Sequence, residues 1–180
     1  MGAAMKIRLV VGLLGITWFH HGLADSCAPI AKAASAYAKA ERYAVKMSMV
    51  SKGETHLTEV MMAPEGMYIR AGEQWIRSPV SISRKDLLNA NKSVYSDCRR
   101  VGEERIDGLQ TVIYRFTGKA DGQPSMTGKM WIGTADSLPH RLEARTQEAD
   151  ITQSIRYDVQ SPKGAASLPG LEQLKGLFGK

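Results

Sequence analysis

Hydrophobic and polar residues alternate with a period of two through most of the chain, a pattern typical of half-buried β-strands. The alternation is clearest in the stretch Ser125–Arg145, where two such segments flank the turn-forming run Gly133–Ser137. Two alternating segments separated by turn residues predict a β-hairpin. Pro139 has no N–H group for a ladder and stands at the start of the second segment, where a strand tolerates proline.

Further alternating segments recur at intervals of about ten residues, with turn-forming residues between them, and this spacing predicts an antiparallel meander. Asp107-Gly108 is the strongest of the turn signals, because both residues tolerate the positive φ angles of a tight hairpin. The strands expected from the pattern cover residues 43–49, 55–62, 67–70, 74–77, 93–101, 103–106, 109–116, 126–132, 138–145 and 151–157.

Three segments show helical rather than strand periodicity. The first, Ala28–Tyr43, carries an apolar stripe at helical spacing, composed of Ile30, Ala33, Ala34, Tyr37, Ala40 and Ala44. The second begins at Ser83, with Asp86 three residues on as in a helix N-cap, and runs to about Lys92. The third is a short amphipathic segment within 168–180. The expected fold class is α+β, a strongly curved antiparallel sheet covered on one face by short helices.

The N-terminal 24 residues have the composition of a secretory signal peptide. Lys6 and Arg8 precede an apolar run, and Gly22 and Ala24 are small residues at the cleavage positions. The apolar run is short for a membrane span, which disfavours an uncleaved anchor. We therefore expect a signal peptide at 1–24, cleavage near Ala24, a periplasmic domain at 25–160, and a linker with the amphipathic segment at 161–180.

The charge of the chain gives no indication of a nucleic-acid partner. Lys and Arg total 24 against 18 Asp and Glu, so losing Lys6 and Arg8 leaves 22 against 18, or +4. No basic run exceeds two residues, and none is interleaved with aromatic residues as on a nucleic-acid surface. A mild positive charge favours at most weak attraction to anionic lipid head groups.

The chain contains two cysteines, Cys27 and Cys98. An even count in an oxidising compartment predicts one disulfide, which would tie the N-terminal helix to the sheet. The alternative is that Cys27 is a lipidated N-terminal cysteine. The preceding residues 23–26 match the sequence required for lipidation poorly, which favours the disulfide.

The residues provide no recognisable catalytic or metal site. After signal-peptide removal only His56 and His140 remain, in separate expected strands and without carboxylate or cysteine partners at metal-ligand spacing. The motifs of serine hydrolases, zinc proteases and phosphate-binding loops are absent. We therefore expect a protein that is not an enzyme and that uses no cofactor and no metal; a hydrolase with a dispersed site is disfavoured.

Three short motifs resemble those of a known superfamily. They are the proline-glycine turn with an aromatic residue and an arginine at 63–70, the glycine turn and aromatic strand at 71–75, and the hairpin that joins 130–132 to 138–141. These motifs resemble the LolA/LolB-type superfamily of periplasmic lipoprotein and lipid carriers. The resemblance implies an incomplete β-barrel capped by helices. Ser137 stands where that family usually has glycine, so we expect this turn to be built differently.

The resemblance implies an apolar cavity that holds a lipid or the acyl chains of a lipoprotein. Flexible methionines suit such a cavity, although they also fill gaps in ordinary cores. An envelope sensor or protein-interaction module on the same fold is the alternative. Partners would be a lipid or lipidated protein and an envelope membrane protein, and we expect a monomer. The candidate lining residues, whose inward parity the sequence leaves open, are Met47, Met49, Met67, Tyr68, Trp75, Met130 and Trp131.

Overall fold

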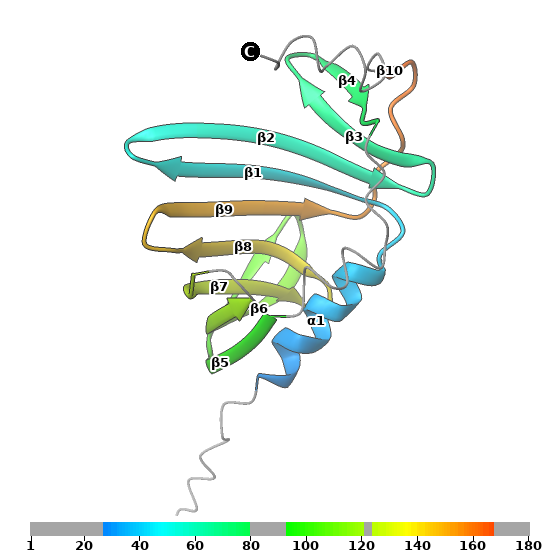
Figure 1. Cartoon of the computed structure of the whole chain (residues 1–180). Coiled ribbons are helices and arrows are strands. Elements are labelled where there is room, and N and C mark those ends of the chain that lie inside the picture. Colours follow the sequence, from blue (N-terminus) through cyan, green and yellow to red (C-terminus); the bar gives the residue numbers. More distant parts are fainter. Residues whose placement is uncertain (1–26, 80–92, 121–123, 168–180) are drawn as a thin grey trace, which may run out of the picture.

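A computed structural model of the chain describes residues 27–79, 93–120 and 124–167. In these ranges the chain forms one helix and one ten-stranded sheet, with the strand order β10-β4-β3-β2-β1-β9-β8-β7-β6-β5 (Figure 1). Every pairing is antiparallel except that of β10 with β4. The sheet is strongly curved and does not close, because β5 and β10 lie at its two edges.

The elements follow the expected order along the chain. The helix α1 spans Ala28–Lys39. The strands are β1 Tyr43–Ser51, β2 Glu54–Ala63, β3 Gly66–Ala71, β4 Gln74–Arg77, β5 Ser93–Ile106, β6 Leu109–Ala120, β7 Met126–Gly133, β8 Pro139–Arg145, β9 Ala149–Arg156 and β10 Ala166–Ser167. The predicted class, a curved antiparallel sheet with a helix on one face, is confirmed.

Three boundaries differ from the sequence prediction. The helix ends at Lys39 instead of Tyr43, because Tyr43 already pairs with Met62 as the first residue of β1. The two strands expected at 93–101 and 103–106 are one strand, β5, which bends at two irregularities in its pairing with β6. The strand β10 was not expected. The predicted signal peptide, the helix at 83–92 and the segment 168–180 lie outside the described residues.

One face of the sheet carries α1, and we refer to it as the helix face. Ile30 and Ala33 of α1 are fully buried against Phe116, Met130 and Ile132, and this cluster is the main core. Gly128 lets β8 and Phe116 approach closely, because a Cβ at this position would clash with the Glu143 carbonyl oxygen and lie 3.0 Å from the Phe116 ring. The helix contacts β5, β7 and β8, and therefore lies over the end of the sheet that these strands form.

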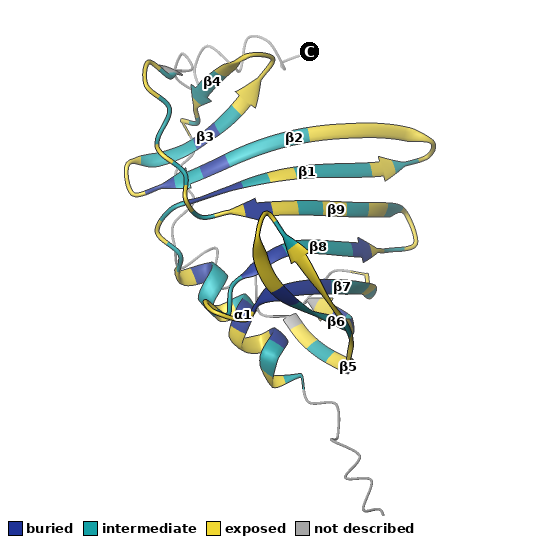
Figure 2. Cartoon of the chain, turned by 180° about the vertical axis from the view of Figure 1, so that it is seen from behind, coloured by how far each residue is buried: buried dark blue, intermediate teal, exposed yellow. Residues whose placement is uncertain are grey.

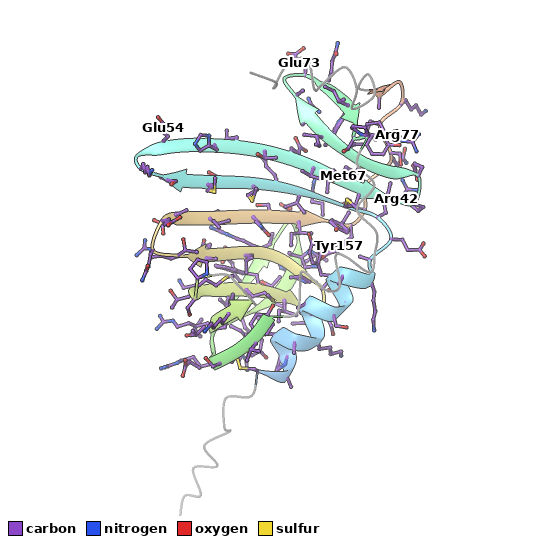
Figure 3. All side chains as sticks on the ribbon, viewed as in Figure 1. Arg42, Glu54, Met67, Glu73, Arg77 and Tyr157 are labelled. Atoms are coloured by element: carbon purple, nitrogen blue, oxygen red, sulfur yellow. A yellow bond between two sulfur atoms is a disulfide. The ribbon has the colours of Figure 1, made fainter. Side chains whose placement is uncertain are left out.

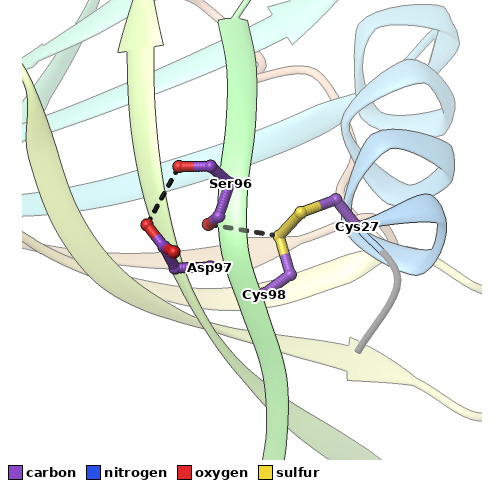
Figure 4. The surroundings of a disulfide bond; sticks show 4 residues. All are labelled: Cys27, Ser96, Asp97 and Cys98. Carbon is purple, nitrogen blue, oxygen red and sulfur yellow. Dashed lines mark hydrogen bonds between the residues drawn. A yellow bond between two sulfur atoms is a disulfide. The ribbon is translucent and has the colours of Figure 1, made fainter. Parts of the chain in front are cut away.

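The predicted disulfide joins Cys27 to Cys98, with 5.1 Å between the Cα atoms (Figure 4). Cys27 directly precedes the first residue of α1, and Cys98 lies in the edge strand β5, so the bond attaches the helix to the sheet. Because Cys27 is paired with Cys98, its sulfur carries no lipid. The structure therefore favours the disulfide over lipidation.

The opposite face of the sheet, which we call the outer face, carries a second, smaller core. Ala44, Met61, Ala63 and Tyr68 are buried there, with Val159 and Ala165 packed against them. The segment 158–165, which we call the strap, crosses this face between β9 and β10 (Figure 2). Within the expected linker, Ala165 packs against this core, while Lys163 and Gly164 are exposed.

Side-chain hydrogen bonds fasten the strap to the sheet. The Ser161 hydroxyl donates to the Glu65 carboxylate, and Arg42 donates to Ser161 and lies 3.4 Å from the same carboxylate. The hydrogen bond from Ser161 is the largest influence that lowers the pKa of Glu65. Arg77 donates to the Glu65 carbonyl, and Figure 3 shows Arg42 and Arg77 at the same end of the sheet.

The β5–β6 hairpin bends over the outer face of the sheet (Figure 2). Its turn is the predicted one, since Asp107 and Gly108 have φ angles of 48° and 84°. The Trp131 indole donates a 2.6 Å hydrogen bond to the Glu104 carboxylate of this hairpin. Only 4% of Trp131 is exposed, so it anchors the hairpin to the sheet.

The β7–β8 turn uses a glycine-like conformation without a glycine. Ser137 has a φ angle of 60°, in the left-handed region that glycine adopts at low cost. Whether this turn differs from that of the family stays a prediction. The backbone N–H of Ser137 donates to the carbonyl of Gly133, and the carboxylate of Asp136 accepts from the N–H of Leu138.

Candidate functional site

The helix face continues beyond α1 as a band of apolar side chains on four adjacent strands. Cross-strand partners in an antiparallel sheet share a face. The pairings Met130–Leu142, Leu142–Gln153 and Gln153–Met47 therefore place Met47 on the face that carries α1. The remaining pairings of β9, β1, β2 and β3 extend this face, and its partly exposed apolar residues are Val45, Met47, Met49, Val60, Met62, Met67, Ile69 and Ile151. We call this set the methionine face.

A pocket of about 400 Å³ lies on the same face, between the first turn of α1 and strands β6 and β7. Val112 and Tyr114 share this face with Met130, since Tyr114 pairs with Met130 and Val112 with Ile132. The lining is mainly apolar and consists of Ala28, Pro29, Lys32, Val112, Tyr114, Ile132, Gly133, Thr134 and Ser137. We call it the helix pocket. The sequence prediction missed Val112, Tyr114 and Ile132, although the hairpin register gives all three the same parity as Met130.

Four of the seven predicted lining residues lie on the helix face. Met47, Met49 and Met67 belong to the methionine face, while Met130 is buried in the core beneath α1. Whether these methionines bind a ligand stays a prediction.

The other three predicted residues are aromatic and lie on the outer face. Tyr68 is buried in the second core, and Trp75 packs against that core under the Arg70 guanidinium, whose Cζ lies 5.4 Å from the ring centroid. Trp131 is held beneath the β5–β6 hairpin. Successive side chains in a strand point to opposite faces. The pairings of these three residues with their neighbouring strands place them on the face opposite to the methionine face. The seven residues therefore do not form one site.

A cluster of aromatic side chains packs where α1 meets β1 and the end of β9. The ring of Tyr43 lies 4.7 Å from that of Tyr37 and 6.4 Å from that of Tyr157. The Tyr157 hydroxyl donates to the Pro139 carbonyl at 2.8 Å. Burial raises the pKa of all three tyrosines, so these phenols stay neutral at physiological pH. The cluster thus extends the packing between α1 and the sheet and has a structural role.

Each remaining histidine lies beside one carboxylate, a partner that the sequence prediction missed. His140 is buried, with its Nε2 atom 2.9 Å from the Asp136 carboxylate, and its ring packs edge-on against Tyr157. His56 is exposed and lies 3.7 Å from Glu54. Across the residues that the structure describes, no group of three histidine, cysteine, aspartate or glutamate side chains could hold a metal ion.

A second cavity, of about 650 Å³, lies on the outer face beneath the β5–β6 hairpin. Its floor is formed by residues of β8, β9, β1 and β2, most of them on the outer face, and its roof by residues 104–107 of the hairpin. We call it the outer cleft. Its charged lining residues are Lys46, Glu59, Glu104, Arg105, Asp107, Arg141 and Arg156, and His140 lines it as well. The outer cleft is therefore polar, in contrast to the helix pocket.

Within 27–79, 93–120 and 124–167, no helix is both long and apolar enough to cross a membrane.

The chain matches no family model and no curated protein sequence. Solved structures with a similar course of the chain include the lipoprotein LppX of Mycobacterium tuberculosis, at 12% identity over 74% of this chain and 96% of that chain, with a TM-score of 0.48. The MucA/MucB complex of Pseudomonas aeruginosa matches at 15% identity, over 84% of this chain and 60% of that chain, with a TM-score of 0.37. A Vibrio parahaemolyticus domain, proposed to be an outer membrane lipoprotein-sorting protein, matches at 9% identity over 74% and 93%, with a TM-score of 0.29.

These likenesses all lie below 25% sequence identity. With every one of these TM-scores below 0.5, they carry no argument about what this chain binds. The function is therefore argued from the faces of its own sheet.

Proposed function

We propose that this protein is an envelope carrier that holds the acyl chains of a lipid or a lipidated protein against its helix face. The observation that carries the proposal is the methionine face. Apolar side chains of four adjacent strands share one side of the sheet and remain partly exposed, while α1 packs mainly over strands β5 to β8. Exposed apolar surface that is contiguous in this way is typical of a binding site.

An unbranched hydrocarbon chain suits this surface better than a polar ligand does. Burial of each methylene group contributes about 0.8 kcal/mol, so an acyl chain gains affinity along its whole length. Methionine side chains are flexible and polarisable, and they adapt to chains of different shape. The helix pocket extends the apolar area on the same face, and Lys32 in its lining offers a positive charge to an anionic head group.

The envelope location rests on the N-terminal sequence and on the disulfide. Residues 1–24 have the pattern of a secretory signal, and a disulfide persists in an oxidising compartment such as the periplasm. Both features support a location in the cell envelope.

The proposal is tested first by native mass spectrometry of the protein purified gently from its own periplasm, followed by organic extraction. Adducts that extract as phospholipid or another acylated species would support the carrier. A clean mass without ligand, together with stable association with an envelope membrane protein, would contradict it and favour an interaction module.

A matched pair of variants locates the site. Met49 lies on the methionine face, and its neighbour Ser48 lies on the outer face of the same strand. With a fluorescent fatty acid as the probe, we expect Met49→Glu to weaken binding at least about tenfold, because the acyl chain would then bury a carboxylate. Ser48→Glu introduces the same charge and should leave binding unchanged. Equal effects of the two variants, with the fold intact by circular dichroism, would contradict a site on the helix face.

A further inference from the structure

The floor of the outer cleft is a row of cross-strand partners. Glu59 of β2 pairs with Lys46 of β1, Lys46 with Ser154 of β9, and Ser154 with Arg141 of β8. Direct partners in a sheet hold their side chains about 5 Å apart on the same face, so this row is a continuous polar surface. Thr152 and Arg156 flank it on β9.

Two of the charged residues in the cleft are already used by the fold. Arg141 lies over the Trp131 ring, 4.8 Å from its centroid, and donates to Glu143 at 2.5 Å. Glu104 accepts the indole hydrogen bond of Trp131. These interactions hold the hairpin above the sheet and so create the space beneath it.

The other charged residues of the cleft form no ion pair within the described part of the chain. Lys46, Arg105 and Arg156 form no ion pair with any residue of 27–79, 93–120 or 124–167. Glu59 and Asp107 are likewise without an ion pair in these ranges. Three cations therefore face two carboxylates, and the hydroxyl groups of Thr152 and Ser154 add further donors.

We propose that the outer cleft is a second binding site, separate from the acyl site, for a ligand that carries a phosphate group. A phosphate offers several strong acceptor oxygens and up to two negative charges, which match a surplus of ammonium, guanidinium and hydroxyl donors. Glu59 and Asp107 would accept hydrogen bonds from hydroxyl or amino groups elsewhere on the ligand. The volume of about 650 Å³ lies within the range of small-molecule sites.

This site does not depend on the proposed acyl site, because the two lie on opposite faces of the sheet. A lipid whose chains lie on the methionine face cannot place its head group in the outer cleft without passing around an edge of the sheet. The phosphate therefore belongs to a different molecule, which is either a soluble phosphate ester or a head group at a membrane surface.

Titration calorimetry of the full chain with glycerol 3-phosphate, at fixed ionic strength, tests for the soluble source. Flotation with phosphatidylcholine vesicles, with and without phosphatidic acid, tests for the membrane source. We expect binding in one of these two arms. The double variant Lys46→Gln/Arg156→Gln should weaken it at least about tenfold, a loss of two charge-assisted contacts.

The control is the double variant Arg115→Gln/Lys129→Gln. It removes the same amount of positive charge from the outer face, but outside the cleft. It should leave binding unchanged, while a fatty-acid probe should bind all of these variants equally. Absence of binding in both arms would overturn the proposal, as would an equal loss in the two double variants, which indicates unspecific attraction. Loss of the fatty-acid probe alone would instead count against the acyl site.

Discussion

Removal of the Cys27–Cys98 disulfide should destabilise this protein severely. The bond joins residues 71 positions apart. In the loop-entropy model, a closed loop of this length stabilises the native state by about 4 kcal/mol. Cys98 is also 1% exposed, and its truncation to alanine adds on the order of 1 kcal/mol of lost packing. For Cys27→Ala/Cys98→Ala we therefore expect a loss of about 4–5 kcal/mol.

The structure also shows where this loss would act. The helix α1 has 12 residues, a length at which isolated helices are marginal, so its stability depends on packing and on its covalent attachment. Ala28 and Pro29, which follow Cys27 directly, line the helix pocket. The free helix would therefore detach first at its N-terminal end and open the wall of that pocket.

Urea unfolding followed by circular dichroism measures the effect in the oxidised protein, the reduced protein and the double variant. The reduced protein and the variant should unfold at similar urea concentrations, both well below that of the oxidised protein. In thermal unfolding the loss corresponds to a Tm lower by roughly 8–20 °C. Ser96→Ala, a change beside the disulfide that leaves it intact, serves as the control. A difference below about 1 kcal/mol between oxidised and reduced protein would refute the reasoning.

Three further predictions follow from single residues. Trp131→Phe removes the hydrogen bond to Glu104 and should lower the free energy of unfolding by about 2 kcal/mol, while Glu104→Gln, which keeps an acceptor, should cost less than half of that in the same urea titration. Ser137→Gly should raise Tm slightly, because relief of the positive φ, about 1–2 kcal/mol, exceeds the entropy cost of glycine; a lower Tm would contradict this. Burial raises the pKa of Tyr157 above its ordinary value, so above about pH 10 this phenol ionises easily only in the unfolded chain. The free energy of unfolding is therefore complete below about pH 10 and falls as the pH rises further. Tyr157→Phe should flatten this fall when urea midpoints are measured against pH.

Local sequence was sufficient for most of the secondary structure. The period of two located nine of the ten strands in the described ranges, because side chains in a half-buried strand must alternate between core and solvent. Asp107-Gly108 marked its hairpin, since few other residue pairs adopt two positive φ angles at low cost. The disulfide needed only a count, because a chain with two cysteines has one possible intramolecular pair.

The positions of the candidate sites could not be predicted from the local sequence. Periodicity groups the residues of one strand into two faces, but it does not say which face of the sheet receives α1. Met67 and Tyr68 are neighbours in β3 and lie on opposite sides, so a selection by residue type combined both faces. The register of the whole sheet had to be known before the methionine face separated from Tyr68, Trp75 and Trp131.

The outer cleft and the strap depend on contacts between distant parts of the chain. Lys46, Arg105 and Arg156 line the same cleft only because β1 pairs with β9 and the β5–β6 hairpin bends over them. The strap has no periodicity, and Ser161 reaches Glu65 across 96 positions of sequence. Sequence alone thus determined which segments become strands and which cysteines pair, since these depend on local backbone preference and on composition. Which face is covered, and which charges meet, was decided by tertiary packing, because it depends on the order and curvature of strands far apart in the chain.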